Sequence, residues 1–269
     1  MDIIQVITKE LNVEKWQVEA AVKLIDEGCT IPFISRYRKE ATGSLNDEQL
    51  RTLHERLTYL RNLEEKKNQV LGSIEEQGKL TAELKKQILD AQTLVVVEDL
   101  YRPFRPKRRT RAIIAKEKGL EPLANIIMLQ MTDKPIEEEA QDFVSEDKGV
   151  ESVADAINGA KDIIAEHISD EADYRIYLRK LTMDRGSVAS TAKKPEESSV
   201  YEMYYEFEEP IKKLAGHRVL ALNRGEKEKI LTVKVNAPEE EAMGWLQKQV
   251  ITKENPITKP ILREVVEDS

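Results

Sequence analysis

The sequence is poor in the residues on which disulfide-rich, zinc-bound and β-barrel folds depend. Its 269 residues contain 1 cysteine, 11 glycines and 5% aromatic side chains. The single Cys29 excludes an intramolecular disulfide and a multi-cysteine zinc site, and such cysteine usage is typical of a reducing compartment. Few aromatics and glycines, next to abundant Leu, Ile, Ala, Glu and Lys, favour helices over a β-sandwich or barrel. We therefore expect a mainly α fold.

Signals for export, membrane insertion and catalysis are also missing from the sequence. The first residues, Met-Asp-Ile-Ile-Gln-Val, lack the basic start and apolar core of a signal peptide, and no apolar run approaches the length of a membrane span. There are only 3 histidines, and no phosphate-loop, dinucleotide-binding, zinc-protease or serine-hydrolase motif occurs. We therefore expect a cytoplasmic protein that contacts no membrane, is not an enzyme, and uses neither a metal nor another cofactor.

One short stretch reverses the charge of a chain whose formal net charge is -8. Residues 102–111, here called the basic loop, contain no carboxylate and six cations: Arg102, Arg105, Lys107, Arg108, Arg109 and Arg111. Pro103 and Pro106 withhold two amide donors and bias the preceding arginines toward extended backbone, so we expect an irregular loop. Arginine forks bind phosphate oxygens, and Phe104 offers a stacking face, which indicates contact with a nucleic-acid backbone.

The sequence leaves a second interpretation of the basic loop open. Basic runs often pair with the chain's own carboxylates or with another domain, and we give this interpretation the same weight as nucleic-acid contact. A smaller basic cluster, Arg36, Arg38 and Lys39, follows the segment Thr30-Ile-Pro-Phe-Ile. We expect this cluster to assist the basic loop.

The hydrophobic pattern predicts a string of helices followed by a small α+β segment. Asn46, with Gln49 in the capping-box position, begins a long helix that extends to about residue 77. The apolar run 94–97 fits a buried strand or a short buried helix, and we favour the helix. The expected organisation is an elongated multihelical domain at 1–186, a linker at 187–199, and an α+β segment at 200–269 with a β-hairpin over 217–236.

Three longer stretches are too specific to be explained by helix periodicity alone. They read Glu27-Gly-Cys-Thr-Ile-Pro-Phe-Ile-Ser-Arg-Tyr-Arg-Lys-Glu-Ala-Thr-Gly, Glu98-Asp-Leu-Tyr-Arg-Pro-Phe-Arg-Pro-Lys-Arg-Arg-Thr-Arg, and His217-Arg-Val-Leu-Ala-Leu-Asn-Arg-Gly-Glu. Each resembles the bacterial Tex family of transcription accessory proteins, and the similarity runs along essentially the whole chain.

The resemblance implies a nucleic-acid-associated protein related to a eukaryotic transcription elongation factor. Members of the family combine an elongated helical scaffold with a ribonuclease-H-like domain, helix-hairpin-helix motifs and a carboxy-terminal S1 domain. This chain is similar to their amino-terminal region, including a helix-turn-helix-like portion, and is expected to stop before the ribonuclease-H-like domain. No catalytic residue is implied for this region.

Residues and resemblance together predict a non-enzymatic helical scaffold of a transcription accessory protein. The leading hypothesis is that the basic loop, helped by Arg36, Arg38 and Lys39, contacts the phosphates of RNA or DNA without reading bases. The alternative is a protein-interaction module in which the same cations dock RNA polymerase, other transcription machinery or the downstream domains of a longer protein.

Overall fold

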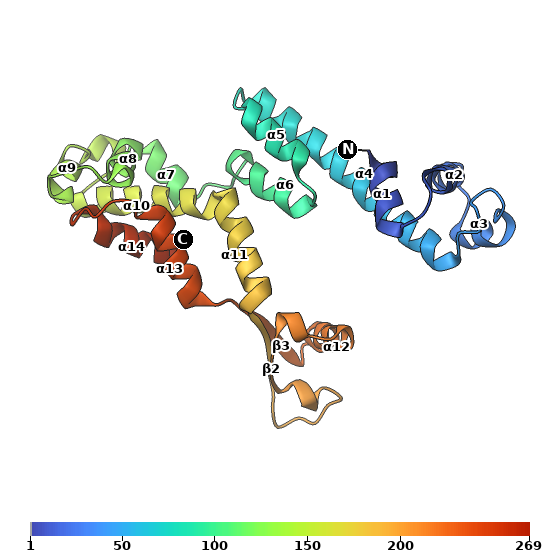
Figure 1. Cartoon of the computed structure of the whole chain (residues 1–269). Helices are drawn as coiled ribbons and strands as arrows, with labels where there is room; N and C mark the ends of the chain where they lie inside the picture. Colours follow the sequence, from blue (N-terminus) through green and yellow to red (C-terminus); the bar gives the residue numbers. More distant parts are fainter. Residues whose placement is uncertain (1) are drawn as a thin grey trace. The chain divides into compact units, whose positions relative to one another are not determined.

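The computed structural model describes residues 2–269, which form two compact units (Figure 1). The first unit spans Met1–Phe104 and the second spans Arg105–Ser269. The described part of unit 1 contains α1 (Ile3–Leu11), α2 (Lys15–Asp26), α3 (Ile31–Tyr37), α4 (Asp47–Glu76), α5 (Ala82–Asp90), α6 (Leu94–Tyr101) and the short 3-10 helix η1 (Arg102–Phe104). Among residues 2–269, no helix has both the length and the apolarity needed to cross a membrane.

The long helix α4 organises unit 1, because α1, α2, α3, α5 and α6 all contact it. It begins as the sequence predicts: Asn46 accepts from the Gln49 amide at 2.8 Å, and the Gln49 side chain accepts from the Asn46 amide at 3.0 Å. Such a capping box satisfies amides that have no partner inside the helix. The leucines that repeat at three- and four-residue steps are buried: Leu50, Leu53, Leu57, Leu60 and Leu63.

A buried lysine interrupts the apolar seam of α4. Lys67 is almost fully buried, and its Nζ donates to the Leu89 carbonyl at 2.8 Å and to Glu64 Oε1 at 3.1 Å. The ammonium therefore has the partners that a buried charge requires. The run 94–97 lies in α6, capped by Thr93, so the helix we favoured there is confirmed.

Unit 2 combines eight α-helices with a three-stranded sheet within its described residues. The helices are α7 (Arg111–Glu117), α8 (Glu121–Leu129), α9 (Ile136–Gln141), α10 (Val153–Asp170), α11 (Ala172–Arg185), α12 (Gly216–Lys227), α13 (Glu239–Val250) and α14 (Thr258–Asp268). Helix α10 is central, with α7, α8, α9 and α14 in contact with it. Figure 1 shows the red α14 beside the yellow α10, although about ninety residues separate them in sequence. Their facing apolar side chains form one core.

The small sheet has the antiparallel order β2-β1-β3 and corrects the predicted hairpin. Its strands are β1 (Ser187–Ala192), β2 (Glu206–Pro210) and β3 (Leu231–Asn236). The expected hairpin over 217–236 is wrong in its first half, because those residues form α12. The second half is a strand, but it pairs with β1, inside the expected linker 187–199. The domain limits at 186 and 199 stay a prediction.

The reason for the error lies at Gly225, which the sequence pattern presents as a turn glycine. Gly225 is buried in α12, and a Cβ there would lie 2.6 Å from Cδ1 of Leu231. Glycine thus permits the close approach of helix and strand over a small core of Tyr201, Leu222 and Leu231. The mainly α fold with a small β element is confirmed, while the helix-turn-helix-like portion stays an expectation.

Candidate nucleic-acid interface

The basic loop is irregular where its prolines predicted it to be. Arg102 lies in η1 at the end of α6, residues 105–110 have neither helix nor strand, and Arg111 begins α7. The loop therefore starts in unit 1 and continues into unit 2, where its remaining five cations lie. All of its arginines are exposed, whereas Lys107 is half-buried.

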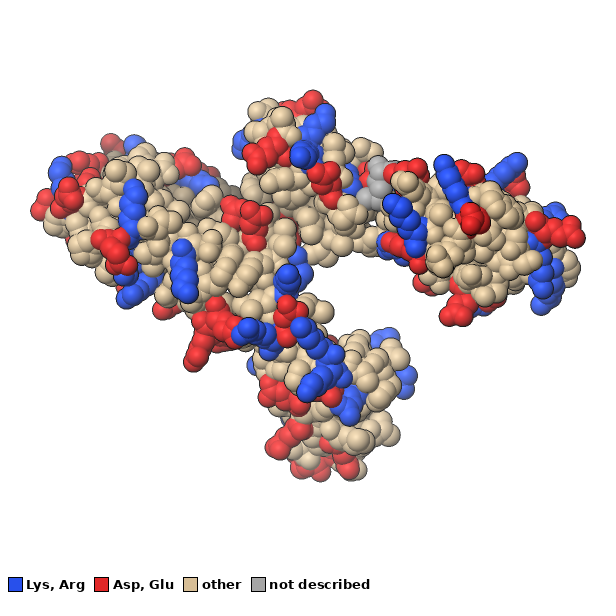
Figure 2. All heavy atoms as spheres, in the orientation of Figure 1, with Lys and Arg blue, Asp and Glu red and all other residues tan. Residues whose placement is uncertain are grey.

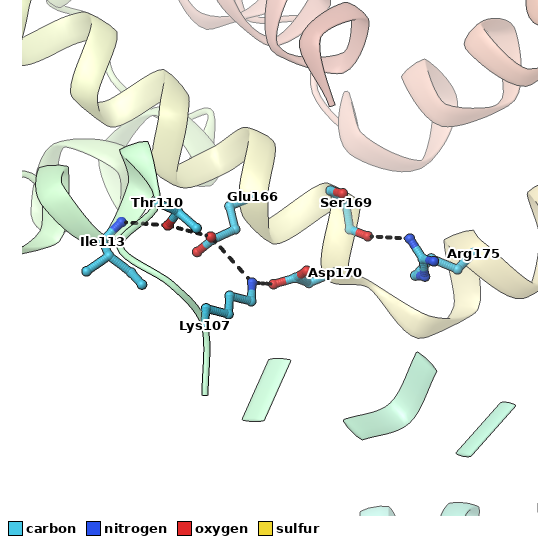
Figure 3. Close-up of polar contacts among 7 residues, drawn as sticks. All are labelled: Lys107, Thr110, Ile113, Glu166, Ser169, Asp170 and Arg175. Carbon is cyan, nitrogen blue, oxygen red and sulfur yellow. Dashed lines mark hydrogen bonds and ion pairs between the residues drawn. The ribbon is translucent and has the colours of Figure 1, made fainter. Parts of the chain in front are cut away.

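Lys107 fixes the loop to α10 rather than facing solvent. Its Nζ forms an ion pair with Asp170 and lies 3.4 Å from Oε1 of Glu166 (Figure 3). The Lys107 side chain is 21% exposed and Asp170 10%, so this cluster is partly shielded from water. Ion pairs in such surroundings are screened less by salt than surface pairs. Lys107 is consequently a structural anchor.

Thr110 adds a second attachment between the loop and α10. Its Oγ1 accepts from the Ile113 amide at 3.1 Å, which caps α7, and donates to Glu166 Oε1 at 2.9 Å (Figure 3). Threonine is a preferred N-cap residue because its hydroxyl satisfies an amide that the helix leaves open. The end of the loop and the start of α7 are thus held by the same contacts.

Two arginines of the loop make exposed ion pairs within unit 2. Arg109 Nη2 lies 2.8 Å from Glu117, and Arg111 lies 2.9 Å from Asp268 and 3.3 Å from Asp162. The two arginine side chains are 69% and 71% exposed. Burial raises the pKa of the Asp162 carboxyl above its ordinary value, although the Arg111 guanidinium acts in the opposite direction.

The remaining loop arginines differ in what they contact. Arg108 is exposed and has no hydrogen-bond or ion-pair partner among residues 2–269. Arg102 and Arg105 are exposed but each has an interaction within the chain. The structure is therefore compatible with both interpretations of the loop. Lys107 pairs with the chain's own carboxylates, whereas the Arg108 side chain has no such partner among the described residues and is exposed to solvent.

A regular spacing of acids on α10 explains the pairing. Asp162, Glu166 and Asp170 are four residues apart, a spacing that places side chains on one face of a helix. Each of them contacts a cation of the basic loop. The spacing is visible in the sequence, but nothing in the sequence indicates that this face meets the loop.

The smaller basic cluster lies on and after α3 in unit 1. Arg36, Arg38 and Lys39 are all exposed, and none has a carboxylate partner among residues 2–269. Sequence reasoning missed two residues beside them, Phe33 and Tyr37, which are 38% and 61% exposed. Their spacing of four residues on a helix was the available signal. We call Phe33, Arg36, Tyr37, Arg38 and Lys39 the α3 surface.

Buried contacts hold the α3 surface in place. Ile34 and Thr42 are fully buried, and the Thr42 hydroxyl donates to the Arg38 carbonyl at 3.2 Å. Gln17 of α2 donates to the carbonyls of Thr42 and Gly43 at 3.2 and 3.0 Å. These buried side chains and hydrogen bonds therefore fix the backbone that carries the three cations.

Neither basic surface contains a metal centre. Within the described part of the chain, no group of three or more His, Cys, Asp or Glu side chains is arranged to hold a metal ion. Over the face drawn in Figure 2, basic and acidic side chains alternate on both units. Nucleic-acid contact would thus depend on local clusters rather than on a uniformly basic face.

Two family models cover most of this chain. The model of the Tex-like protein N-terminal domain matches residues 1–75, and the model described as Tex central region-like matches residues 131–265. The chain belongs to the Tex family. The stretch between the two matches, residues 76–130, contains the basic loop.

Relatives of this Tex-family chain occur in bacteria and in humans. It is 47% identical over 268 residues to the uncharacterized protein YdcI of Bacillus subtilis, a match that covers 98% of this chain and 37% of YdcI. It is 41% identical to the transcriptional accessory protein Tex of Neisseria gonorrhoeae, over 87% of this chain and 31% of that protein. It is 32% identical to the human S1 RNA-binding domain-containing protein 1, over 87% of this chain and 24% of that protein. The chain thus spans about a third or less of these relatives.

Proposed function

We propose that this Tex-family region is a scaffold that contributes phosphate contacts to RNA or DNA through the basic loop. The observation that carries the proposal is that the cations of the loop have two different environments. Lys107 attaches the loop to α10, while the side chains of Arg108, Arg109 and Arg111 remain exposed. The names of two relatives, a transcriptional accessory protein and an S1 RNA-binding domain-containing protein, support this kind of partner.

The ion pairs of the loop do not prevent phosphate contact. Exposed pairs such as Arg109 with Glu117 contribute about 1 kcal/mol or less, because water screens them and the long side chains lose entropy. A nucleic acid offers many phosphates and releases counterions on binding, which favours exchange of the partner. Contacts of this kind position a strand without reading its sequence.

The test is fluorescence anisotropy with labelled single-stranded RNA, single-stranded DNA and duplex DNA across a salt series. The triple variant Arg108→Ala, Arg109→Ala, Arg111→Ala should bind more weakly to all three. Its log-log salt slope should be smaller by about 0.7 to 0.9 for each lost phosphate contact.

The matched control removes three exposed cations elsewhere in unit 2: Arg224, Lys227 and Lys248. This control lowers the net charge equally and should retain the wild-type slope. Equal losses in both variants would attribute binding to net charge alone. Unchanged binding in the loop variant would overturn the proposal.

A second candidate function is docking of an acidic protein surface. It is favoured by the contacts of Arg109 and Arg111, since both guanidinium groups already accommodate carboxylates of unit 2. RNA polymerase, other transcription machinery and the downstream domains of a longer protein are the expected partners. Purified RNA polymerase should then be retained by the immobilised chain but not by the loop variant, whose nucleic-acid binding would be unchanged.

A further inference from the structure

The α3 surface has a feature that phosphate contact alone does not use, a pair of exposed aromatic rings. The centroids of Phe33 and Tyr37 are 5.4 Å apart, with planes tilted by 47°. Tyr37 is 61% exposed and Phe33 is 38% exposed, although large apolar side chains normally contribute to the core. Ile34, between them in sequence, is fully buried and fixes the helix that carries both rings.

Cations lie against these rings instead of against carboxylates. The Arg38 guanidinium carbon is 5.3 Å from the Phe33 centroid, and that of Arg36 is 6.0 Å from the Tyr37 centroid. Cation–π pairs at exposed sites are worth only about 0.5 to 1 kcal/mol, so they yield readily to a ligand. Between residues 30 and 44, Glu40 is the only acidic residue. Arg36, Arg38 and Lys39 form no ion pair with a carboxylate among residues 2–269.

Exposed aromatic rings next to cations that make no ion pair match one class of ligand. Bases stack on aromatic side chains whatever their sequence, while arginine and lysine contact the backbone phosphates between them. In a duplex the base faces are stacked on one another and are not available to a side chain, so the rings select unpaired strands. A carboxylate-rich protein would pair with the cations but would gain little from the rings.

We propose that the α3 surface binds single-stranded nucleic acid, with bases stacked on Tyr37 and Phe33 and phosphates held by Arg36, Arg38 and Lys39. The inference deepens the proposed function, because it rests on the chain contacting nucleic acid at all. It differs from the role of the basic loop, which contacts phosphates of any strand. RNA and DNA share the chemistry involved, so both belong in the test.

The decisive measurement compares single-stranded and duplex affinities of the full chain. Labelled oligo-uridine, oligo-thymidine and a duplex DNA are titrated with the wild type and with Phe33→Ala, Tyr37→Ala. We expect the double variant to bind both single strands about tenfold more weakly, because stacking contributes substantially per base, and to bind the duplex within about twofold of the wild type. Tyr37→Phe, which retains the ring, should keep wild-type affinity.

A charge control separates the cations of the α3 surface from the charge of unit 1. Arg36→Glu, Arg38→Glu, Lys39→Glu should weaken single-strand binding and reduce its log-log salt slope by about 0.7 for each lost phosphate contact. The control Lys79→Glu, Lys85→Glu, Lys86→Glu changes the net charge equally at exposed positions of the same unit. It should lose far less affinity. Circular dichroism melting of each variant verifies that unit 1 remains folded. If the double variant Phe33→Ala, Tyr37→Ala does not fold, the single variant Tyr37→Ala replaces it in the binding test.

The outcomes separate the two proposals whenever the wild-type chain binds nucleic acid. If the aromatic variants lose single-strand affinity while the basic-loop variant loses none, the α3 surface stands and the role of the loop falls. Equal losses on single-stranded and duplex ligands, or none on either, overturn the stacking inference whatever the loop does. A wild-type chain that binds no nucleic acid overturns both.

Discussion

The two basic surfaces of this chain have similar composition and opposite surroundings. In the basic loop, Lys107, Arg109 and Arg111 pair with carboxylates of unit 2. On the α3 surface, Arg36, Arg38 and Lys39 have no carboxylate partner among residues 2–269, and the two arginines lie beside exposed rings instead. The stretch with more positive charge in sequence is therefore the more neutralised one in space. The density of cations along a chain is a poor measure of the charge that a ligand meets.

The largest expected effect concerns the anchoring of the basic loop. Lys107→Met keeps the apolar part of the side chain but removes the ammonium that pairs with Asp170 and lies 3.4 Å from Glu166. We expect the free energy of unfolding of unit 2 to fall by about 2 kcal/mol, measured by urea denaturation. The value lies below that of a fully buried pair because Lys107 retains some contact with water.

The matched change on the α3 surface should be nearly silent. The Lys39 side chain is exposed and has no hydrogen-bond or ion-pair partner among residues 2–269, so Lys39→Met should alter the stability of unit 1 by about 0.5 kcal/mol or less. Similar losses for the two substitutions would contradict the contrast between an anchored loop and an unpaired surface.

A smaller effect on stability is expected from substitution of Thr110 and Thr30, the threonines that precede α7 and α3. Thr110→Val removes the cap of α7 and the hydrogen bond to Glu166 while preserving the shape of the side chain, so we expect a loss of about 1 kcal/mol. Thr30 precedes α3 without making a side-chain cap. Thr30→Val should change the stability of unit 1 by about 0.5 kcal/mol or less, with both threonine variants measured by urea denaturation. Equal losses would show that Thr110 makes no specific contribution.

The smallest expected effect comes from removing two carboxylates that pair with the basic loop, which makes the loop resemble the α3 surface. Glu117→Gln with Asp268→Asn removes carboxylates that pair with Arg109 and Arg111, and should strengthen nucleic-acid binding at low salt by about two- to threefold. The control Glu239→Gln, Glu240→Gln makes the same charge change at exposed positions of α13. A gain of the same size in the control, seen by anisotropy, would show that only net charge matters.

Local signals predicted much of the helical fold. The capping box at Asn46, the long helix that it begins and the short helix at 94–97 all occur as expected, because they depend on residues within one or two turns. The hairpin was wrong because Gly225 is needed for a close contact between α12 and Leu231, and a glycine in sequence does not distinguish a turn from such a contact.

The sequence by itself determined most of the helices, the irregular backbone of the basic loop and the family to which the chain belongs. These depend on capping, on periodicity and on the fixed φ of proline, all of which act over short distances along the chain. Only the tertiary structure decided which cations are neutralised, because the acids of α10 and α14 that contact the loop are about 50 to 160 residues away. It likewise decided that Phe33 and Tyr37 remain exposed, since burial depends on the helices packed against the opposite face of α3.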